Sequence, residues 1–472
     1  MMRSTWGATL WAGACSLACL SACSGSDGGP DTGDPAASGS AGEGAGGTAT
    51  SGQTSGAGGS SGVIAQAGSA GGGGRAGGGG GGGNGGSLGS AGTAGRSDAG
   101  AAGGRTDAGF TPPTCASTQL PAGAPALTPG VWKNLSPPGV PFNTMDGSFT
   151  QGMTTDPCNP ANLYVSIVGF GAVSLPHKGI YRSTDAGSSW TKMGKLETVI
   201  NLRVDPNDPK HMYAVDGVTG STNGFWISTD GGDTWAIPDS FTKLAQSDLI
   251  FDSYHVEPDP ADFKHILVTF HNPWKAAKYN GNSGIIESMD GGSTWIVHPP
   301  INPSWAGGYD AFFLYDPALG IGNKNTWLFG TQGQGYWRTT DAGQTWTKVS
   351  DVNMDHGGGT LYYTKEGTLY ASGAPKLLRS TDNGATWTPL TPYQFTAFLS
   401  VIGDGNRIYA AGHFGGKVMT SPETDGLTWT AYGNDPAEFS SSGPFEMRFD
   451  AANGILYSAH TGAGIWALKV KP

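Results

Sequence analysis

The chain has 472 residues and a formal net charge of −11, and its 81 glycines are unevenly distributed. Charged residues make up only 13% of it, whereas an average soluble protein has about 25%. This acidic, weakly charged composition argues against a nucleic-acid partner and against charge-driven binding to an anionic membrane surface.

The first 22 residues have the pattern of a secretory signal. Arg3 precedes a mostly small and apolar run that is too short to span a membrane. The run ends in Leu20-Ser21-Ala22-Cys23, which resembles the bacterial lipobox, in which the cysteine is acylated and becomes the new N-terminus. The resemblance implies a lipid anchor on Cys23 and, because serine follows it, placement at the outer membrane or cell surface. The alternative is an ordinary signal peptide.

Residues 23–112 are predicted to be a disordered tether. Positions 24–112 contain 35 glycines and one aromatic residue, Phe110. Such a segment cannot bury enough apolar surface to offset the entropy lost on ordering. A flexible chain of this length has a root-mean-square span of roughly 50 Å. We therefore expect it to hold a folded domain, residues 113–472, clear of the membrane.

Two cysteines remain beyond the signal and the anchor, Cys115 and Cys158. An even pair in an exported protein favours one disulfide, and two free thiols are the alternative. The pair supplies too few ligands for a metal site, and no Cys/His spacing completes one. No cofactor is predicted.

Residues 113–472 contain an eight-residue repeat with an Asp, a Gly and a final Trp. Five clean copies begin at Ser183, Ser228, Ser288, Thr339 and Ser380, and a degraded sixth runs from Ser421 to Trp429. Short apolar segments flank each copy, which indicates a hairpin turn. The Asp is expected to accept backbone N–H bonds and the Gly to supply a positive φ. The Trp is large enough to pack between neighbouring sheets.

A second hairpin precedes most copies, so each unit of about 45 to 50 residues contains four short strands. This period predicts an all-β fold, a seven-bladed β-propeller. Residues 130–135 resemble a strand that follows a repeat, but none precedes them. We expect this strand to join residues 464–470 in a seventh blade closed by both ends of the domain. Six blades with a decorated end is the alternative.

The repeat resembles the Asp-box, or bacterial neuraminidase repeat, of sialidases, sortilin-type receptors, two-propeller xyloglucan-hydrolysing enzymes and photosystem assembly propellers. In those families the box is a structural turn at the periphery of a blade. The resemblance therefore implies structural rather than catalytic roles for the repeat aspartates Asp185, Asp230, Asp290, Asp341 and Asp382.

Most of the catalytic features of these families have no counterpart in this sequence. Sialidase activity is disfavoured because the early Arg-Ile-Pro segment is missing. Arg203 and Arg448 hold equivalent places in their blades, where ion pairs between blades are favoured over binding of a substrate carboxylate. The xyloglucanase pattern is closer, with Trp132-Lys133-Asn134 as an opening strand. That family, however, uses a cleft between two propellers, and its first-blade catalytic aspartate has no counterpart at residues 168–171.

Propeller topology brings the loops between second and third strands and the loops between blades to one face. When the loops of the sequence are assigned to this face, histidines and acidic residues gather on one rim. They include Asp252, His255, His271, Asp310, Asp355, His356, His413, Glu446 and His460. A carboxylate–imidazole cluster could act as general acid and base on a sugar, or hold a divalent cation. The alternative, favoured residue by residue, is a set of hydrogen-bonding groups that close loops over a polar channel.

Aromatic residues occur on two long loops of the same face. They are Trp274, Tyr279, Trp305 and Tyr309. On exposed loops such rings offer flat apolar surfaces to sugar rings. The sequence therefore predicts a carbohydrate-binding platform between blades three and four.

The resulting hypothesis is a surface-tethered carbohydrate-active propeller that binds polysaccharide and, as a glycoside hydrolase or lyase, cleaves it. Asp310 and Asp355 are the predicted catalytic carboxylates, assisted by His356 and His271. His413 and His460 are added to the four aromatic residues as substrate-binding residues. The alternative is a non-catalytic propeller that binds a protein partner or serves assembly at the outer membrane.

Overall fold

The computed structural model describes residues 119–142, 148–169, 176–217, 224–248, 250, 252–300, 305, 307–315, 324–354, 359–392, 397–413 and 415–471. Several predicted residues lie outside these ranges: Cys23, Cys115, Asp355, His356 and the side chain of Tyr309. The predicted disulfide between Cys115 and Cys158 therefore stays a prediction. No helix in the described ranges is long and apolar enough to cross a membrane.

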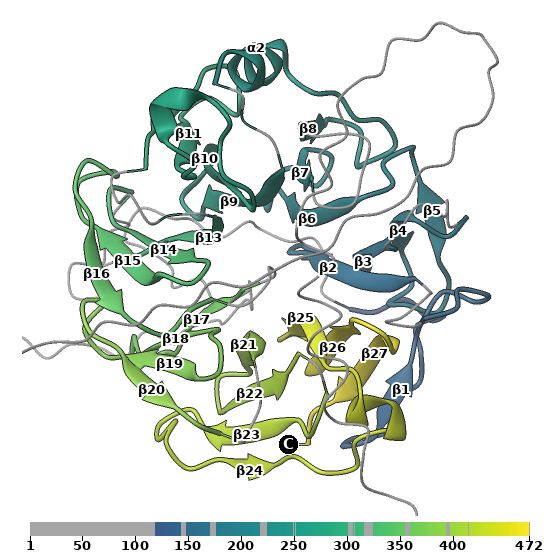
Figure 1. Cartoon of the computed structure of the whole chain (residues 1–472). Coiled ribbons are helices and arrows are strands. Elements are labelled where there is room, and N and C mark those ends of the chain that lie inside the picture. Colours follow the sequence, from purple (N-terminus) through teal and green to yellow (C-terminus); the bar gives the residue numbers. More distant parts are fainter. Residues whose placement is uncertain are drawn as a thin grey trace, which may run out of the picture. The chain divides into compact units, whose positions relative to one another are not determined.

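The described residues form seven small antiparallel sheets that surround a central axis as the blades of a β-propeller, with the first strand of each blade nearest the axis (Figure 1). This confirms the predicted fold and blade number. The strands of blades one to four are β2 (Phe149–Asp156), β3 (Asn159–Val168), β4 (Gly179–Ser183), β5 (Thr191–Met193); β6 (Val199–Val204), β7 (Met212–Asp216), β8 (Gly224–Ser228); β9 (Ser253–Asp259), β10 (Asp262–Phe270), β11 (Ile285–Ser288), β12 (Ile296–His298); β13 (Gly308–Phe313), β14 (Trp327–Thr331), β15 (Gly335–Thr339) and β16 (Thr347–Ser350).

The last three blades continue the same order. Their strands are β17 (Leu361–Tyr363), β18 (Leu369–Ala371), β19 (Leu377–Ser380), β20 (Thr388–Leu390); β21 (Phe398–Gly403), β22 (Arg407–Gly412), β23 (Met419–Pro422), β24 (Thr430–Ala431); β25 (Pro444–Asp450), β26 (Ile455–His460) and β27 (Gly464–Lys469). Blade seven is completed by β1 (Trp132–Asn134), which pairs with β27 so that Trp132 faces Leu468. The predicted closure of the ring by both ends of the domain is confirmed, and it removes an exposed sheet edge.

Blade two departs from the repeat. Its described sheet has three strands, and the place of the fourth is taken by one bridge between Ile227 and Ala236. Pro238 follows, and a proline has no N–H with which to continue the strand pairing. The chain instead forms α2 (Asp239–Asp248), whose buried Phe241 packs 6.1 Å from the ring of Phe225. This helix was not predicted.

The five clean repeats form turns held by the same hydrogen bonds. In the first, Asp185 Oδ1 accepts the N–H of Ser189 at 2.8 Å and Ser183 Oγ accepts the N–H of Gly187 at 2.8 Å. The bond from the fourth residue after the Asp recurs at Asp230, Asp290, Asp341 and Asp382. The predicted acceptor role of the Asp and the positive φ of the Gly, 92° at Gly187, are both confirmed.

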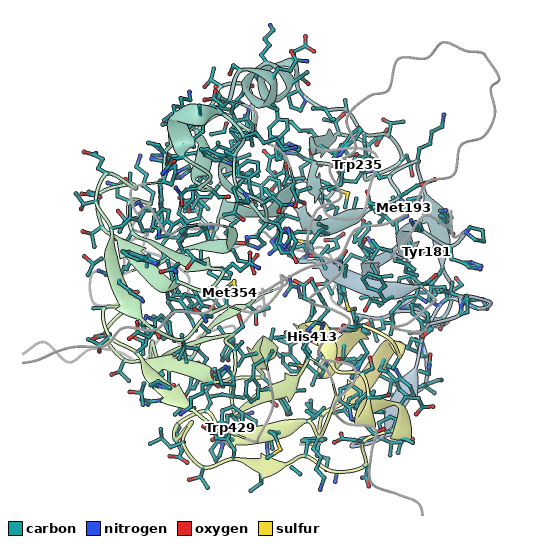
Figure 2. All side chains as sticks on the ribbon, viewed as in Figure 1. Tyr181, Met193, Trp235, Met354, His413 and Trp429 are labelled. Carbon is teal, nitrogen blue, oxygen red and sulfur yellow. The ribbon has the colours of Figure 1, made fainter. Side chains whose placement is uncertain are left out.

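Each turn also contacts the preceding blade. Arg182 Nη1 in blade one donates to the carbonyl of Gly231 in the second turn at 3.4 Å, and Arg338 Nε does the same for Asn383 at 3.1 Å. The repeat tryptophans pack across the same seams, as Trp235 does in one cluster with Met193 (Figure 2). The prediction that the tryptophans lie between neighbouring sheets is confirmed.

Candidate functional site

The first strands of six blades share a register shift at the same place, a β-bulge near the axis. Bulges re-aim side chains and are frequent next to functional sites. We call the residue two positions after the start of the shift, and its equivalent in blade five, the latch position. In blade order it is occupied by Gly152, Asn201, His255, Asp310, Thr360, Ser400 and Glu446.

At several seams the latch side chain accepts a backbone N–H from the first strand of the next blade. The pairs are Asn201 Oδ1 with Val256 N at 3.3 Å, Thr360 Oγ1 with Val401 N at 2.7 Å, Ser400 Oγ with Met447 N at 2.9 Å, and Glu446 Oε2 with Met153 N at 2.6 Å. These bonds tie neighbouring blades together beside the axis. The seam between His255 and Asp310 has no such bond in the described residues, because two ionisable side chains face each other there.

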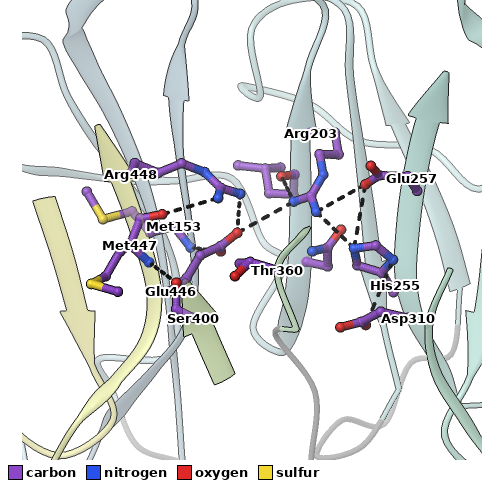
Figure 3. A network of polar contacts seen from close by, with 12 residues as sticks. Met153, Arg203, His255, Glu257, Asp310, Thr360, Ser400, Glu446, Met447 and Arg448 are labelled. Carbon is purple, nitrogen blue, oxygen red and sulfur yellow. Dashed lines mark hydrogen bonds and ion pairs between the residues drawn. The ribbon is translucent and has the colours of Figure 1, made fainter. Parts of the chain in front are cut away.

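Charged and titratable side chains of four blades meet at this level and form what we call the axial cluster (Figure 3). Its members are Arg203, His255, Glu257, Asp310, Glu446 and Arg448. They occupy the latch position or the position two residues later in β6, β9, β13 and β25. Side chains two residues apart on a strand point to the same side, so all six are aimed at the axis.

Arg203 lies in the middle of the axial cluster. Its Nη2 is 2.9 Å from His255 Nε2 and 3.4 Å from Glu257 Oε2, and its Nη1 is 3.9 Å from Glu446 Oε1. Glu446 is also paired with Arg448 on its own strand. The prediction that Arg203 and Arg448 join blades through ion pairs, rather than waiting for a substrate carboxylate, is confirmed for Arg203, which bridges blades seven, two and three.

His255 and Asp310 are the most deeply buried members, with side chains 2% and 0% exposed. Their closest polar atoms, Nδ1 and Oδ1, are 3.8 Å apart, too far for a hydrogen bond. Burial lowers the pKa of His255 well below its usual value, and the charge of Arg203 adds to this. Burial raises the pKa of Asp310 well above its usual value, against the opposing charge of Arg203. Both groups therefore favour their neutral forms.

The predicted rim histidines are buried and bonded rather than displayed. His271 Nδ1 lies 2.9 Å from Asp252 Oδ2, and His413 Nε2 lies 3.0 Å from Thr461 Oγ1. His460 Nδ1 donates to the carbonyl of Ser442 at 2.8 Å, and burial lowers the pKa of His460 to about 4. These contacts match the alternative of hydrogen-bonding groups that close loops, and the burial of Asp310 and His271 gives no support to their predicted catalytic roles.

The prediction that the long loop of blade three exposes aromatic rings is wrong. Trp274 is 1% and Tyr279 is 6% exposed, and their rings pack edge to face at 4.7 Å. The loop contains a short 3₁₀ helix, η1 (Ala277–Tyr279), and the Tyr279 hydroxyl bonds to Asp248 at the end of α2. The loop thus folds onto a helix that the sequence did not reveal, and this covers the rings.

Trp305 is also buried, with 1% of its surface exposed. Its ring packs edge to face against Phe329, Trp337 and Trp346 at 5.1, 5.5 and 5.6 Å. Trp337 is half-buried and lies three residues after Gln334, the last residue of the β14–β15 turn, to whose carbonyl its indole N–H donates. Two rings of this region are therefore partly open, that of Trp346, which ends a repeat turn, and that of Trp337, which lies on a strand rather than on a loop.

Glu257 and Asn201 were not singled out from the sequence. A signal was present: Asn201-x-Arg203, His255-x-Glu257 and Glu446-x-Arg448 place polar residues two apart in otherwise apolar first strands. Such alternation marks a strand face that is turned to other polar groups. Within the described residues, no group of three His, Cys, Asp or Glu side chains is arranged to hold a metal ion.

Residues 320–453 match a family model, the DUF6242 beta propeller domain. The chain therefore contains a β-propeller domain. The chain is also 27% identical over 284 residues to a xyloglucanase of Hypocrea jecorina (strain QM6a), which covers 50% of this chain and 32% of the relative. Xyloglucanase Xgh74A of Acetivibrio thermocellus is 28% identical over 280 residues, with the same coverage. The chain spans about a third of the length of the curated relatives it matches.

Two solved structures are similar to this chain at low identity. YCF48 bound to D1 peptide has a TM-score of 0.48 and 16% identity, and covers 75% of this chain and 100% of its own. An ancestral GH74 enzyme has a TM-score of 0.42 and 18% identity, and covers 65% of this chain and 40% of its own. Neither likeness carries an argument about function.

Proposed function

We propose that this protein is a surface-tethered propeller that binds polysaccharide, with a β-glucan of the xyloglucan type as its ligand. The observation that carries the proposal is the 27% identity to a xyloglucanase over half of the chain. The acidic, weakly charged composition fits a neutral polymer better than an anionic one. The Asp-box character of the repeat turns and the lipid anchor on Cys23 belong to the same proposal.

Binding is proposed ahead of cleavage because of the burial of the one described candidate carboxylate. Asp310 is 0% exposed, and a general acid must come within hydrogen-bond reach of the glycosidic oxygen. The axial cluster is also internally paired, since Arg203 contacts both Glu257 and Glu446. These groups contact one another and join neighbouring blades. We therefore place polymer binding at the surface of the propeller, away from the axial cluster.

The test is affinity electrophoresis of the full chain in gels containing xyloglucan, with mixed-linkage β-glucan, starch and a gel without polymer as comparisons. Retardation by xyloglucan alone is expected. Reducing ends are measured in parallel, and their release would make the protein a hydrolase. Equal mobility in every gel would overturn the proposal and favour the protein-binding alternative.

A matched pair of variants locates the binding face. Trp337 and Trp387 are both half-buried, and each indole N–H donates at 3.1 Å to a carbonyl three residues earlier. Trp337 lies near the β14–β15 turn, whereas Trp387 ends a repeat turn at the other end of its blade. Trp337→Ala is expected to weaken retardation by xyloglucan and Trp387→Ala to leave it unchanged. The opposite order would place binding on the face of the repeat turns.

The tether has its own test. Cys23→Ala is expected to move the protein from the membrane fraction to the soluble fraction of cells and to abolish incorporation of labelled palmitate. Cys15→Ala, within the signal segment, serves as the control that keeps a cysteine change but spares the lipobox and the predicted disulfide. Unchanged fractionation of the Cys23 variant would remove the lipid anchor from the proposal.

A further inference from the structure

We propose that the seam between blades three and four is a pH-sensitive joint, in which Asp310 is a carboxylic acid at neutral pH and its ionisation, inside the protein and away from water, destabilises the folded seam. The latch positions of blades three and four differ from those of blades two, five and six. Neutral side chains of Asn201, Thr360 and Ser400 bond to the backbone of the next blade. At blades three and four, two ionisable groups stand in their place.

Arg203 decides where the protons of the pair are. A guanidinium can only donate hydrogen bonds, so His255 Nε2, which is 2.9 Å from Arg203 Nη2, must accept. The neutral imidazole then carries its hydrogen on Nδ1, on the side of Asp310 Oδ1. Protonating Nε2 would break the bond to Arg203 and place two cations side by side. Asp310 is therefore the member of the pair that can gain or lose a proton.

The surroundings of Asp310 also favour the acid. Neither of its oxygens, nor His255 Nδ1, has a hydrogen-bond partner of good geometry among the described residues, and the nearby backbone N–H of Gly359 offsets only part of the effect of burial on the pKa of Asp310. The backbone of Gly359 lies so close that a Cβ there would come within 2.5 Å of Asp310 Oδ2, which leaves no room for a side chain to approach. A carboxylate at this position would lose its hydration and gain few hydrogen bonds in exchange.

Among the residues that the structure describes, the titratable groups that face the pair come from four strands. Arg203 in β6 favours ionised Asp310, whereas Glu257 in β9 and Glu446 in β25 oppose it. Arg448 in β25 is paired with Glu446. Tyr336 in β15 donates its hydroxyl to the carbonyl of Ser372 at 2.7 Å, and Asp310 contributes to the raised pKa of that phenol. Burial, supported by the two carboxylates, outweighs Arg203 and the backbone of Gly359, so the acid form is favoured on balance.

Linkage fixes the sign of the effect. An unfolded aspartate ionises near pH 4, so above that pH the folded chain holds a proton that the unfolded chain has lost. Stability then falls as pH rises, up to the folded pKa, and the unfolding equilibrium constant increases by up to tenfold per pH unit. Asp310→Asn keeps the shape but cannot ionise, so the difference in pH dependence between the two proteins reports the ionisation of Asp310 together with its effect on neighbouring groups.

The experiment is urea unfolding of the full chain and of Asp310→Asn at pH 5, 6, 7 and 8. The ratio of the wild-type unfolding constant to that of the variant is expected to rise at least tenfold between pH 5 and pH 7. Ser400→Ala, which removes a non-ionisable latch of the same ring, is the matched control and should give a constant ratio. A ratio for Asp310→Asn that changes less than twofold from pH 5 to pH 8 would overturn the proposal.

A second measurement does not depend on the variant folding. The native chain is labelled with ¹³C at the aspartate carboxyl carbons, and each carboxyl shift is followed with pH. One aspartate is expected to remain protonated at pH 7, and its signal should be missing from Asp310→Asn where that variant folds. If every aspartate carboxyl titrates below pH 5, the proposal fails. Neither experiment uses a polysaccharide, so the outcome is independent of the proposed function.

Discussion

The carboxylate of Glu446, in the last blade, accepts the backbone N–H of Met153, in the first blade, at 2.6 Å. This bond joins the two ends of the propeller beside the axis, whereas the pairing of Trp132 with Leu468 joins them at the rim. Because the Glu446 side chain is 4% exposed and also pairs with Arg203 and Arg448, closure of the ring depends on a buried charge.

Glu446→Ala should therefore destabilise the propeller strongly. The change leaves the N–H of Met153 and the guanidinium of Arg448 without their partner in a buried place, and removing one member of a buried ion pair typically costs about 3–5 kcal/mol. Urea unfolding of the full chain measures the loss. Glu446→Gln keeps an acceptor for Met153 and should lose less. Equal stability of Glu446→Ala and the wild type would show that the axial bond contributes nothing to closure.

The repeat aspartates are predicted to act in folding and not in ligand binding. Asp341 Oδ1 accepts the N–H of Thr345 at 2.8 Å and its Oδ2 accepts the hydroxyl of Thr345 at 2.7 Å, and these bonds lower the pKa of Asp341. Asp341→Ala should cost about 1 kcal/mol, because the turn is exposed and water replaces part of each bond. Binding to xyloglucan gels should be unchanged, and a loss of binding without a loss of stability would give this turn a functional role.

The repeat turns could be predicted because their information is local. Ser183, Asp185 and Gly187 bond within five residues, so the eight-letter pattern contains the whole turn. The blade number followed from counting these turns. Even here the local rule was incomplete, since Ala186 and Ala342 also take positive φ, 58° and 54°, where only the glycine was expected to.

The axial cluster could not be predicted in the same way, because it depends on registers between strands far apart in the chain. Arg203 meets Glu446 only after six blades have closed the ring. The bulge before each latch position then decides which side chain faces the axis, since a shift by one residue turns a strand's side chains to the other face. His255 and Glu446 were consequently expected on the rim but lie within β9 and β25.

Burial of the aromatic loop residues was also beyond the sequence. Trp274 and Tyr279 were judged exposed because their loop is long and polar. The residues around α2 cover these two rings. This helix forms because the described sheet of blade two has no fourth strand and Pro238 ends the strand pairing. An irregularity in one blade thus buries the insertion of the next.

Trp274→Ala accordingly tests a core residue and not a sugar platform. Trp274 is 1% exposed and packs on Phe270 and Tyr279 at 5.4 and 4.7 Å, so truncation should cost about 3–5 kcal/mol. Trp274→Phe, which keeps a ring, should cost less. Affinity for xyloglucan, measured well below the unfolding temperature, should stay unchanged. Lost affinity in a variant of normal stability would restore the ring to the binding surface.

A buried chain of charged side chains in blade three, on the side that packs against Phe313 and Trp327 of blade four, predicts a pH optimum of stability. His265 lies 3.1 Å from Asp259 and 2.7 Å from Glu287, and His298 lies 2.8 Å from the same Glu287. Although burial opposes the charge, these hydrogen bonds raise the pKa of His265 to about 9. They also lower the pKa of Glu287 to about 2, again against its burial.

The sign follows from each shift. The raised pKa of His265 makes its contribution complete below about pH 6.5 and lost as pH rises toward 9. The lowered pKa of Glu287 makes its contribution complete above about pH 4.5 and lost as pH falls toward 2. His265→Gln should therefore lose most stability, relative to the wild type, between about pH 4.5 and 6.5. The difference in free energy of unfolding between the two proteins should narrow as the solution becomes alkaline.

Urea unfolding at pH 3, 5.5, 7.5 and 9 measures that difference, with His177→Gln as the control for a half-buried histidine outside the chain of charges. The control should show a small and nearly constant difference. A difference for His265→Gln that stays level from pH 5.5 to pH 9 would mean that His265 is neutral in the folded protein. Glu287 would then have to draw its stabilisation from His298 alone, and the ion pairs of this seam would be ordinary hydrogen bonds.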